Sequence, residues 1–298
     1  MIYTCTTNPS LDYYITIPAL VKGVNNRSDM EMFDAGGKGV NVSIVLNNFR
    51  IPSVALGFLG GFTKDYYLQF ISRYPNIQPL FTSIADNTRI NLKLMGPDAE
   101  TGINAKGPHI TDDEFARFRR RMNSIYTDDI FVLSGNIEEE IKDRMIDLIY
   151  ELTADGVKVV LDTDRDILDR CVDAKPFAIK LNRSNIQDDD IAELAQKLLD
   201  RGVKNVLYSA PHERSYIFTE QESWLCDSLA GSLVNVTGTA DSMVAGFLYG
   251  VIRGADTSES FRYANAASLA TCMTNDLGSK EKIEALYDTI GIEAYEKV

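Results

Sequence analysis

The stretch AGGKGVN, residues 35–41, places two adjacent glycines directly ahead of an amphipathic run. Gly36 and Gly37 allow the backbone to turn tightly and to approach a ligand closely, and the spacing predicts a helix over residues 38–49. The start of a helix presents free N–H groups and the positive end of its dipole, which suit sugar hydroxyls or a phosphate. The GxxxxGK[ST] spacing of a Walker A loop is absent. Taken alone, the glycine pair fits ordinary strand-to-helix geometry equally well.

Short runs rich in β-forming residues alternate with amphipathic helical runs along most of the chain. This rhythm predicts a doubly wound, mostly parallel sheet covered by helices. The predicted core strands are residues 2–6, 54–59, 130–134, 157–162, 177–181 and 205–209. The predicted helices between them are residues 38–49, 64–74, 111–126, 138–153 and 189–201. Two or three short strands are expected after residue 214, and almost wholly helical structure after residue 240.

Two stretches break this rhythm. Residues 12–17 and 89–95 alternate polar and apolar side chains, and a further short run follows at 101–106. Such alternation is typical of half-buried strands, so we predict a small separate sheet.

Composition restricts the partners and the compartment. The 298 residues carry a formal net charge of -13, which opposes binding to nucleic acid or to an anionic membrane surface. The four cysteines form no CxxC pair, which favours a reducing compartment. The first residues lack the pattern of a secretion signal, and the apolar run over residues 243–252 is too short to span a bilayer. We therefore expect a cytoplasmic protein.

A second stretch, NVTGTADSMVAGF at residues 235–247, puts a turn of small residues ahead of a long helix. Asp241 would lie in the first turn of that helix. It is interpreted either as a carboxylate placed favourably against the helix dipole or as a general base beside amides that stabilise a phosphoryl group. Spacing does not choose between these two roles.

Together the two stretches carry a resemblance. GGKGVN at residues 36–41 and GTADS at 238–242 resemble the hallmark segments of the PfkB (ribokinase-like) carbohydrate kinases. TNPSLD at 7–12, TRINLKL at 88–94 and the KxN at 180–182 are similar to the 1-phosphofructokinase and tagatose-6-phosphate kinase branch. The resemblance implies a ribokinase-like three-layer α/β/α fold in one domain, residues 1–298, with a small β-sheet lid formed by residues 11–33 and 88–107.

The resemblance also implies a pocket for a small phosphorylated sugar. Asp12 would accept hydrogen bonds from two sugar hydroxyls, and the segment of Gly36, Gly37 and Asn41 would line the same sugar. The phosphate already on the sugar would be held by three basic side chains, Lys38, Arg89 and, from the lid, Lys106. Lys93 would face away from this phosphate.

On the nucleotide side the resemblance implies ATP as phosphoryl donor and Mg²⁺ travelling with it. Asp241 would be the general base, and the backbone of Gly238, Thr239 and Ala240 would form an anion hole. The nucleotide contacts would come from Lys180, Asn182 and Ser209. A homodimer through the lid is also implied.

Three departures from the family pattern fall on this nucleotide side. Ala240 stands where a glycine normally precedes the base, and the NxxE segment ends in Asn185 instead of the acid. The SxGxxG loop reads SAPHER at residues 209–214. The first hypothesis is an ATP-dependent 1-phosphofructokinase. The alternatives are a tagatose-6-phosphate kinase, a degenerate kinase that serves as a sugar-phosphate binding protein, and a kinase that uses another phosphoryl donor.

Other polar clusters are interpreted without a function. The four aspartates at positions 162, 164, 166 and 169 are taken as a solvated acidic loop instead of a metal site. His109 and His212 are taken as ordinary loop residues because neither belongs to a triad or a ligand cluster.

Overall fold

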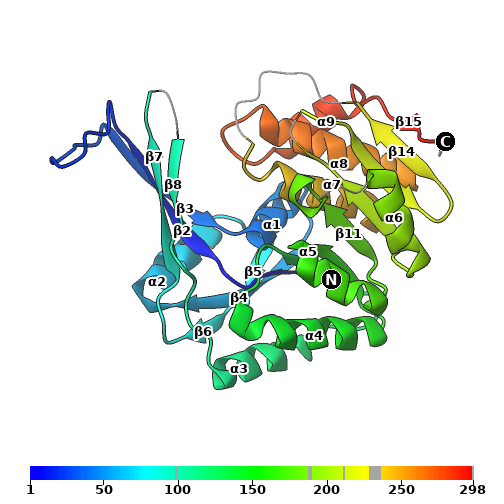
Figure 1. Cartoon of the computed structure of the whole chain (residues 1–298), viewed down its shortest axis with the longest axis horizontal. Coiled ribbons are helices and arrows are strands. Elements are labelled where there is room, and N and C mark those ends of the chain that lie inside the picture. Colours follow the sequence, from blue (N-terminus) through cyan, green and yellow to red (C-terminus); the bar gives the residue numbers. More distant parts are fainter. Residues whose placement is uncertain (98–99, 187–189, 211, 228–235, 297–298) are drawn as a thin grey trace.

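A large mixed sheet runs through the molecule, as the computed structural model shows (Figure 1). The structure describes residues 1–97, 100–186, 190–210, 212–227 and 236–296. Within these residues the sheet has eleven strands in the order β15-β14-β13-β12-β11-β10-β9-β1-β4-β5, with β6 paired to β4. The strands are β1 (Ile2–Thr6), β4 (Ser53–Gly60), β5 (Ile77–Pro79), β6 (Thr82–Ile84), β9 (Ile130–Ser134), β10 (Lys158–Asp162), β11 (Ala178–Leu181), β12 (Asn205–Tyr208), β13 (Ser215–Thr219), β14 (Ser223–Cys226) and β15 (Glu293–Ala294). The pairing is parallel from β5 to β12 and antiparallel from β12 to β15.

Helices pack on both faces of this sheet, which confirms the predicted three-layer α/β/α fold. One face carries α3 (Asp112–Met122), α4 (Lys142–Ala154), α5 (Arg165–Cys171) and α6 (Ile191–Asp200). The other carries α1 (Lys38–Asn48), α7 (Thr239–Ile252), α8 (Thr257–Cys272) and α9 (Lys280–Tyr287). Helix α2 (Gly61–Ile71) and the short 3₁₀ helices η1 (Glu139–Ile141), η2 (Val172–Ala174) and η3 (Arg183–Asn185) complete the set within the described residues.

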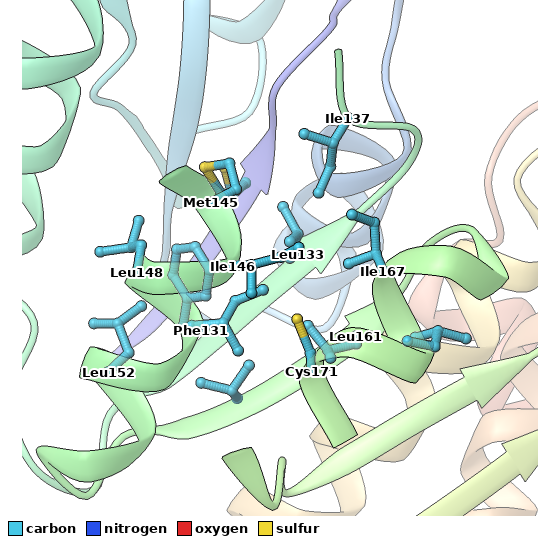
Figure 2. Close-up of a cluster of buried hydrophobic side chains, with 14 of the residues drawn as sticks. Phe131, Leu133, Ile137, Met145, Ile146, Leu148, Leu152, Leu161, Ile167 and Cys171 are labelled. Atoms are coloured by element: carbon cyan, nitrogen blue, oxygen red, sulfur yellow. The ribbon is translucent and has the colours of Figure 1, made fainter. Parts of the chain in front are cut away.

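Side chains alternate between the two faces along each central strand. Phe131 and Leu133 of β9 and Leu161 of β10 point toward α4 and α5, where they meet Met145, Leu148 and other apolar side chains (Figure 2). The intervening Val132 and Val160 belong to the cluster on the α7 face. Each central strand therefore contributes side chains to two apolar cores, one on each face of the sheet. Alternate residues along the strand belong to opposite cores.

A second, four-stranded sheet stands beside the large one, at the left of Figure 1. Its order is β3-β2-β7-β8, from β2 (Ser10–Thr16), β3 (Met30–Gly36), β7 (Arg89–Met95) and β8 (Glu100–Ile103). The predicted small sheet is confirmed, but β3 was not predicted. Four of its seven residues are exposed, so the strand lacks the alternation of buried and exposed positions that reveals a strand in the sequence.

The core strands match the prediction within one residue at each end, whereas β5 and β6 were missed because each has only three residues. The predicted helices are also present, with shifts of a few residues at their ends. The predicted start of α6 at Asp189 lies outside the described residues. All four cysteines are free, and Cys5, Cys171 and Cys226 are buried. Among the described residues, none of the helices combines the length and apolar character that a membrane span requires.

Candidate active site

A cavity of about 520 Å³ lies between the small sheet and the first turns of α1 and α7. It brings together most of the residues that the sequence singled out: Asp12, Gly36, Gly37, Lys38, Asn41, Arg89, Lys106, Gly238 and Asp241. These positions span more than two hundred residues of chain. The fold therefore assembles both quoted stretches into one polar pocket.

Two helices begin at this cavity, and both begin at a glycine. Gly37 precedes α1 with φ of 151°, and Gly238 precedes α7 with φ of 79°, backbone conformations that side-chain-bearing residues rarely adopt. Neither helix has a side-chain N-cap. The free N–H groups and positive dipole ends of two helices are thus directed at one pocket, an arrangement suited to binding anions.

Asp241 is held between these two helices. It lies in the first turn of α7 with only 3% of its surface exposed, and its Oδ2 accepts a 2.8 Å hydrogen bond from Nδ2 of Asn41 on α1. Burial raises the pKa of Asp241 to about 7, and the nearby charge of Asp162 acts in the same direction. The Asn41 hydrogen bond and the ammonium groups of Lys38 and Lys180 oppose the rise. A carboxyl group with such a pKa exchanges protons readily near neutral pH.

At the small-sheet side of the cavity, Asp12 is fixed by its neighbours. Its Oδ1 accepts hydrogen bonds from Ser10 Oγ at 2.9 Å and from Asn91 Nδ2 at 2.8 Å. Its Oδ2 lies close to Gly36, where a Cβ atom would come within 2.7 Å of it. Gly36 therefore provides the space that the carboxylate occupies, and Asp12 is oriented as a hydrogen-bond acceptor facing the cavity.

Basic side chains converge on the same end of the cavity. The guanidinium of Arg89 is anchored by Nη1 to the carbonyl of Ala105 at 3.3 Å and by Nη2 to the carbonyl of Asn8 at 3.1 Å. Lys38, Lys93 and Lys106 line the same cavity. The prediction that Lys93 faces away is therefore wrong. Its position on β7, paired opposite Tyr14 of β2, directs it to the cavity with that tyrosine.

Comparison with known proteins identifies this combination of fold and pocket. The model of the pfkB family carbohydrate kinases matches residues 7–283. The chain belongs to this family. It is therefore a carbohydrate kinase, a phosphotransferase whose acceptor is a hydroxyl group, and the family implies ATP as donor.

Two curated relatives of this kinase cover nearly its whole length. A 1-phosphofructokinase of Bacillus subtilis is 33% identical over 98% of this chain and 99% of the relative. A D-tagatose-1-phosphate kinase of Bacillus licheniformis is 28% identical over 98% and 99%. Among solved structures, a Staphylococcus aureus protein assigned as a phosphofructokinase is 30% identical with a TM-score of 0.88 over all of both chains. The ribokinase of Thermotoga maritima, 15% identical with a TM-score of 0.77 over 97% and 99%, confirms the ribokinase-like fold.

Several residues expected at the nucleotide side of this kinase do not line the cavity. Thr239 and Ala240 belong to the first turn of α7, next to the lining residues Gly238 and Asp241. Lys180 is buried, with 1% of its surface exposed. The roles proposed for them remain predictions.

The two other expected nucleotide contacts also lie outside the cavity. The side chain of Asn182 caps η3 through a 3.1 Å hydrogen bond from the Ser184 N–H. Ser209 follows β12, and its N–H donates to the carbonyl of Leu181 at 3.2 Å. Both residues are thus engaged with the ends of β11 and β12.

The structure gives a local reason for two of the three departures. Ala240 lies inside a helix, where a side chain costs nothing, and the position that needs positive φ, Gly238, has kept its glycine. The Cβ of Ala240 therefore causes no backbone strain at the start of α7. Asn185 is buried, accepts the Asn182 N–H at 2.8 Å and donates to the carbonyl of Thr163 at 3.1 Å. It joins the ends of β10 and β11 as a neutral amide.

A second interpretation from sequence, that of the aspartates from position 162 to 169, is wrong for one residue. Asp162 is the last residue of β10 and is fully buried, whereas the other three aspartates of that segment, at positions 164, 166 and 169, are exposed. It is therefore no part of a solvated loop. Sequence reasoning also missed several polar residues of the cavity, namely Asn8, Tyr14, Asp34, Asn91, Asn104 and Glu138. For Asp162, the signal available in the sequence was its position as the last residue of the strand predicted over residues 157–162, which could have indicated that it is buried.

The described residues contain no group of three or more His, Cys, Asp or Glu side chains arranged to hold a metal ion. Mg²⁺ in kinases is commonly bound by few protein ligands, with nucleotide phosphates and water supplying the rest.

Proposed function

We propose that this kinase transfers the γ-phosphoryl group of ATP to fructose 1-phosphate and so forms fructose 1,6-bisphosphate and ADP. The observation that carries the proposal is the position of Asp241: a buried carboxyl group at the start of α7, at the edge of a polar cavity, and bonded to Asn41. The 33% identity to a 1-phosphofructokinase over almost the whole chain supports the choice of acceptor.

In the proposed reaction, ionised Asp241 takes the proton of the C6 hydroxyl group as that oxygen attacks the γ-phosphorus. The bond between the γ-phosphorus and the oxygen bridging to the β-phosphate breaks, and ADP leaves. The N–H groups at the start of α7, beginning with Gly238 and Thr239, would stabilise the charge on the transferred group. The negative charge on the transferred phosphoryl group would thus lie beside the positive end of the α7 dipole.

The acceptor would be held at the small-sheet side. Asp12 and Asn41 are placed to bind hydroxyl groups of the sugar, with Gly36 and Gly37 allowing its close approach. The phosphate already on the sugar would lie among Lys38, Arg89 and Lys106, and we add Lys93 because it lines the same cavity. Mg²⁺ would enter with the phosphates of ATP and neutralise part of their charge.

We further propose that the small sheet acts as a lid, within a single domain of residues 1–298, and that two lids meet in a homodimer. Its strands expose apolar side chains that a partner would cover: Met30, Met32, Phe33, Ile90 and Ile103. Light scattering would give twice the monomer mass for the native protein and a lower mass for Met32→Lys. A native monomer would contradict the dimer. The buried free cysteines support a cytoplasmic location.

The first experiment is a calorimetric titration with Mg·ATP, with and without fructose 1-phosphate, followed by an assay of ADP release. We expect ATP binding that depends on the sugar phosphate, and turnover that Asp241→Asn abolishes. Tagatose 1-phosphate and tagatose 6-phosphate, tested in parallel, would identify the alternative acceptors by a higher kcat/KM.

One observation favours a second candidate, a sugar-phosphate binding protein that does not transfer phosphate. Asn185 supplies a neutral amide, bonded to the backbone on both sides, where the family pattern has an acid. Binding of the sugar phosphate without ATP binding or turnover would support this candidate and overturn the kinase proposal.

A further inference from the structure

Glu138 brings a carboxylate to the same cavity as the basic side chains that would hold the phosphate of the sugar. It is the last residue before the 3₁₀ helix η1, and its side chain does not cap that helix. The preceding Ile137 is buried in the apolar cluster on the α4 face of the sheet (Figure 2). The carbonyl of Asn136 accepts a 3.1 Å hydrogen bond from Thr7 Oγ1. These contacts fix the backbone ahead of Glu138 and leave its carboxylate to the cavity.

Asn8 links this carboxylate to Arg89. The carbonyl of Asn8 accepts a 3.1 Å hydrogen bond from Arg89 Nη2, and the side-chain amide of Asn8 donates to Glu138 Oε1. Gly107, which follows Lys106, lies against the same carboxylate, since a Cβ atom there would come within 2.5 Å of Glu138 Oε1. The guanidinium, the carboxylate and the backbone next to Lys106 therefore meet at one end of the cavity.

The charges of Arg89 and Glu138 remain available to a ligand. Within the described residues, neither side chain forms an ion pair, and Arg89 Nε is buried without a hydrogen-bond partner. Each terminal nitrogen of Arg89 donates to one backbone carbonyl and can donate once more. Burial lowers the pKa of Arg89, and the charges of Asp12 and Glu138 oppose that change. A cation and an anion thus lie near one another with free hydrogen-bonding capacity.

A ligand that suits this end of the cavity carries an anion and a hydrogen-bond donor on neighbouring atoms. A phosphate monoester is mostly dianionic at neutral pH, because its second pKa is about 6, so it has no proton to donate to Glu138. Like charges repel each other, so a phosphate directly against this carboxylate would bind poorly. A hydroxyl group next to the phosphate would instead donate to the carboxylate and separate the two charges.

We propose that Glu138 is a specificity-determining residue that selects ketose 1-phosphates over ketose 6-phosphates by accepting a hydrogen bond from the C2 hydroxyl group. In the furanose form of a 1-phosphate, the carbon that bears the phosphate is attached to C2, which carries the free anomeric hydroxyl. In a 6-phosphate that carbon is attached to C5, whose oxygen belongs to the ring and can only accept. The inference rests on the proposed function, which places the sugar phosphate in this cavity.

The test compares two ligands that differ only at C2. In 2,5-anhydromannitol 1-phosphate, hydrogen replaces the C2 hydroxyl group of fructose 1-phosphate, whereas the phosphate, the ring and the C6 hydroxyl group are kept. Calorimetric titration gives the Kd of each ligand. The native protein should bind fructose 1-phosphate about tenfold more tightly than the analogue, as expected for a hydrogen bond to a charged acceptor. The ratio of the two Kd values should fall in Glu138→Gln and approach one in Glu138→Ala.

This ratio distinguishes a contact with the sugar from a structural role of Glu138. A displaced Arg89 would weaken both ligands equally, because both carry the same phosphate, and the ratio would not change. Fructose 6-phosphate gives a second sign: without the carboxylate it loses a repulsion and no hydrogen bond, so it should bind more tightly to Glu138→Ala than to the native protein. A native ratio near one, an unchanged ratio in Glu138→Ala, or weaker binding of fructose 6-phosphate to that variant would overturn the proposal.

Glu139→Gln is the matched control, because it removes the same charge from the exposed neighbouring residue, whose carboxylate pairs with Lys142 outside the cavity. This variant should keep the native ratio. Thermal unfolding establishes that each variant is folded. If Glu138→Ala fails to fold, the native ratio and its fall in Glu138→Gln decide the outcome.

The titrations separate this inference from the proposed function, because they need neither ATP nor turnover. Absence of ADP release with fructose 1-phosphate would refute the proposed phosphoryl transfer and leave the ligand ratios valid. Normal turnover in the native protein, with an unchanged ratio in Glu138→Ala, would refute only the role of Glu138.

Discussion

The amide of Asn41 donates a 2.8 Å hydrogen bond to Oδ2 of Asp241, across 200 residues of sequence. The bond joins the first turn of α1 to the first turn of α7, so it fixes the relative position of two helix N-termini that open onto one cavity. Asn41, which lines the cavity, thereby also orients the proposed base.

Asn41→Ala should lower kcat by about tenfold or more, because a hydrogen bond to a buried charged group is worth about 1.5–3 kcal/mol. Loss of the donor also raises the pKa of Asp241, so the acid limb of the pH profile should move upward. Steady-state kinetics from pH 5 to 9 would measure both effects. Asn123→Ala, at an exposed helix end, is the control. A normal pH profile in Asn41→Ala would show that the bond does not orient the base.

Asp241→Asn should increase thermal stability at neutral and alkaline pH while abolishing turnover. Folding raises the pKa of Asp241 from 3.8 to about 7, so between these values the folded protein holds a proton that the unfolded chain has released. Asp241 therefore makes stability fall as pH rises from about 4 to about 7.

The asparagine variant lacks this effect. The difference in Tm between variant and native protein should be small at pH 4, should grow up to about pH 7 and should stay level above it. Differential scanning calorimetry across that range would measure it. A difference that is constant with pH would mean that Asp241 is not the buried titrating group.

Gly36→Ala should weaken binding of the sugar phosphate selectively. The added Cβ would lie 2.6 Å from Ser10 Oγ and 2.7 Å from Asp12 Oδ2, closer than such atoms tolerate, so the carboxylate must move. We expect KM for the sugar phosphate to rise about tenfold, since overpacking of this kind costs about 1–3 kcal/mol, and KM for ATP to stay near its native value. Gly291→Ala, whose Cβ would meet nothing within 4 Å, is the control. Equal increases in both KM values would contradict a specific effect on Asp12.

Ala240→Gly, which restores the residue usual in the family, should not increase kcat. Ala240 lies within α7, and glycine inside a helix destabilises it by about 0.5–1 kcal/mol relative to alanine. Gly238→Ala is the informative comparison. At φ of 79° and with Leu277 Cδ2 2.5 Å from its Cβ, it should lose most activity. Turnover and Tm of both variants would test this, and a faster Ala240→Gly enzyme would show that the alanine does impair the anion hole.

The sequence predicted most residues of the small-sheet side of the cavity because glycine-bearing motifs report backbone geometry directly. Gly36, Gly37 and Gly238 occupy positions where a Cβ would clash or where φ is positive, so their spacing encodes the turns that form the cavity. The core strands were predicted for a similar reason, since a strand buried on both faces is a continuous apolar run.

The buried polar residues at the ends of β10 and β11, Asp162 and Lys180, could not be predicted in the same way. Asp162 begins a series of aspartates at nearly alternate positions, three of which are exposed, and only strand register shows that the first is buried beside Lys180. Strand β3 escaped because most of its residues are exposed. Contacts between distant segments and strands without a buried face leave no local pattern in a single sequence.

Asn185→Glu, which restores the acid of the family pattern, should destabilise this kinase without increasing turnover. The asparagine is 2% exposed, and its Nδ2 donates to the carbonyl of Thr163 at 3.1 Å. Glutamate would replace that donor with a buried negative charge facing a carbonyl oxygen, which costs about 1–3 kcal/mol or more. Ser184→Glu adds the same charge at the exposed neighbouring position and should leave Tm nearly unchanged. Thermal unfolding and Mg²⁺-dependent turnover of both variants would test this. If Asn185→Glu is as stable as the native protein and faster at low Mg²⁺, the amide is not a required structural link and the site can accept an acidic residue.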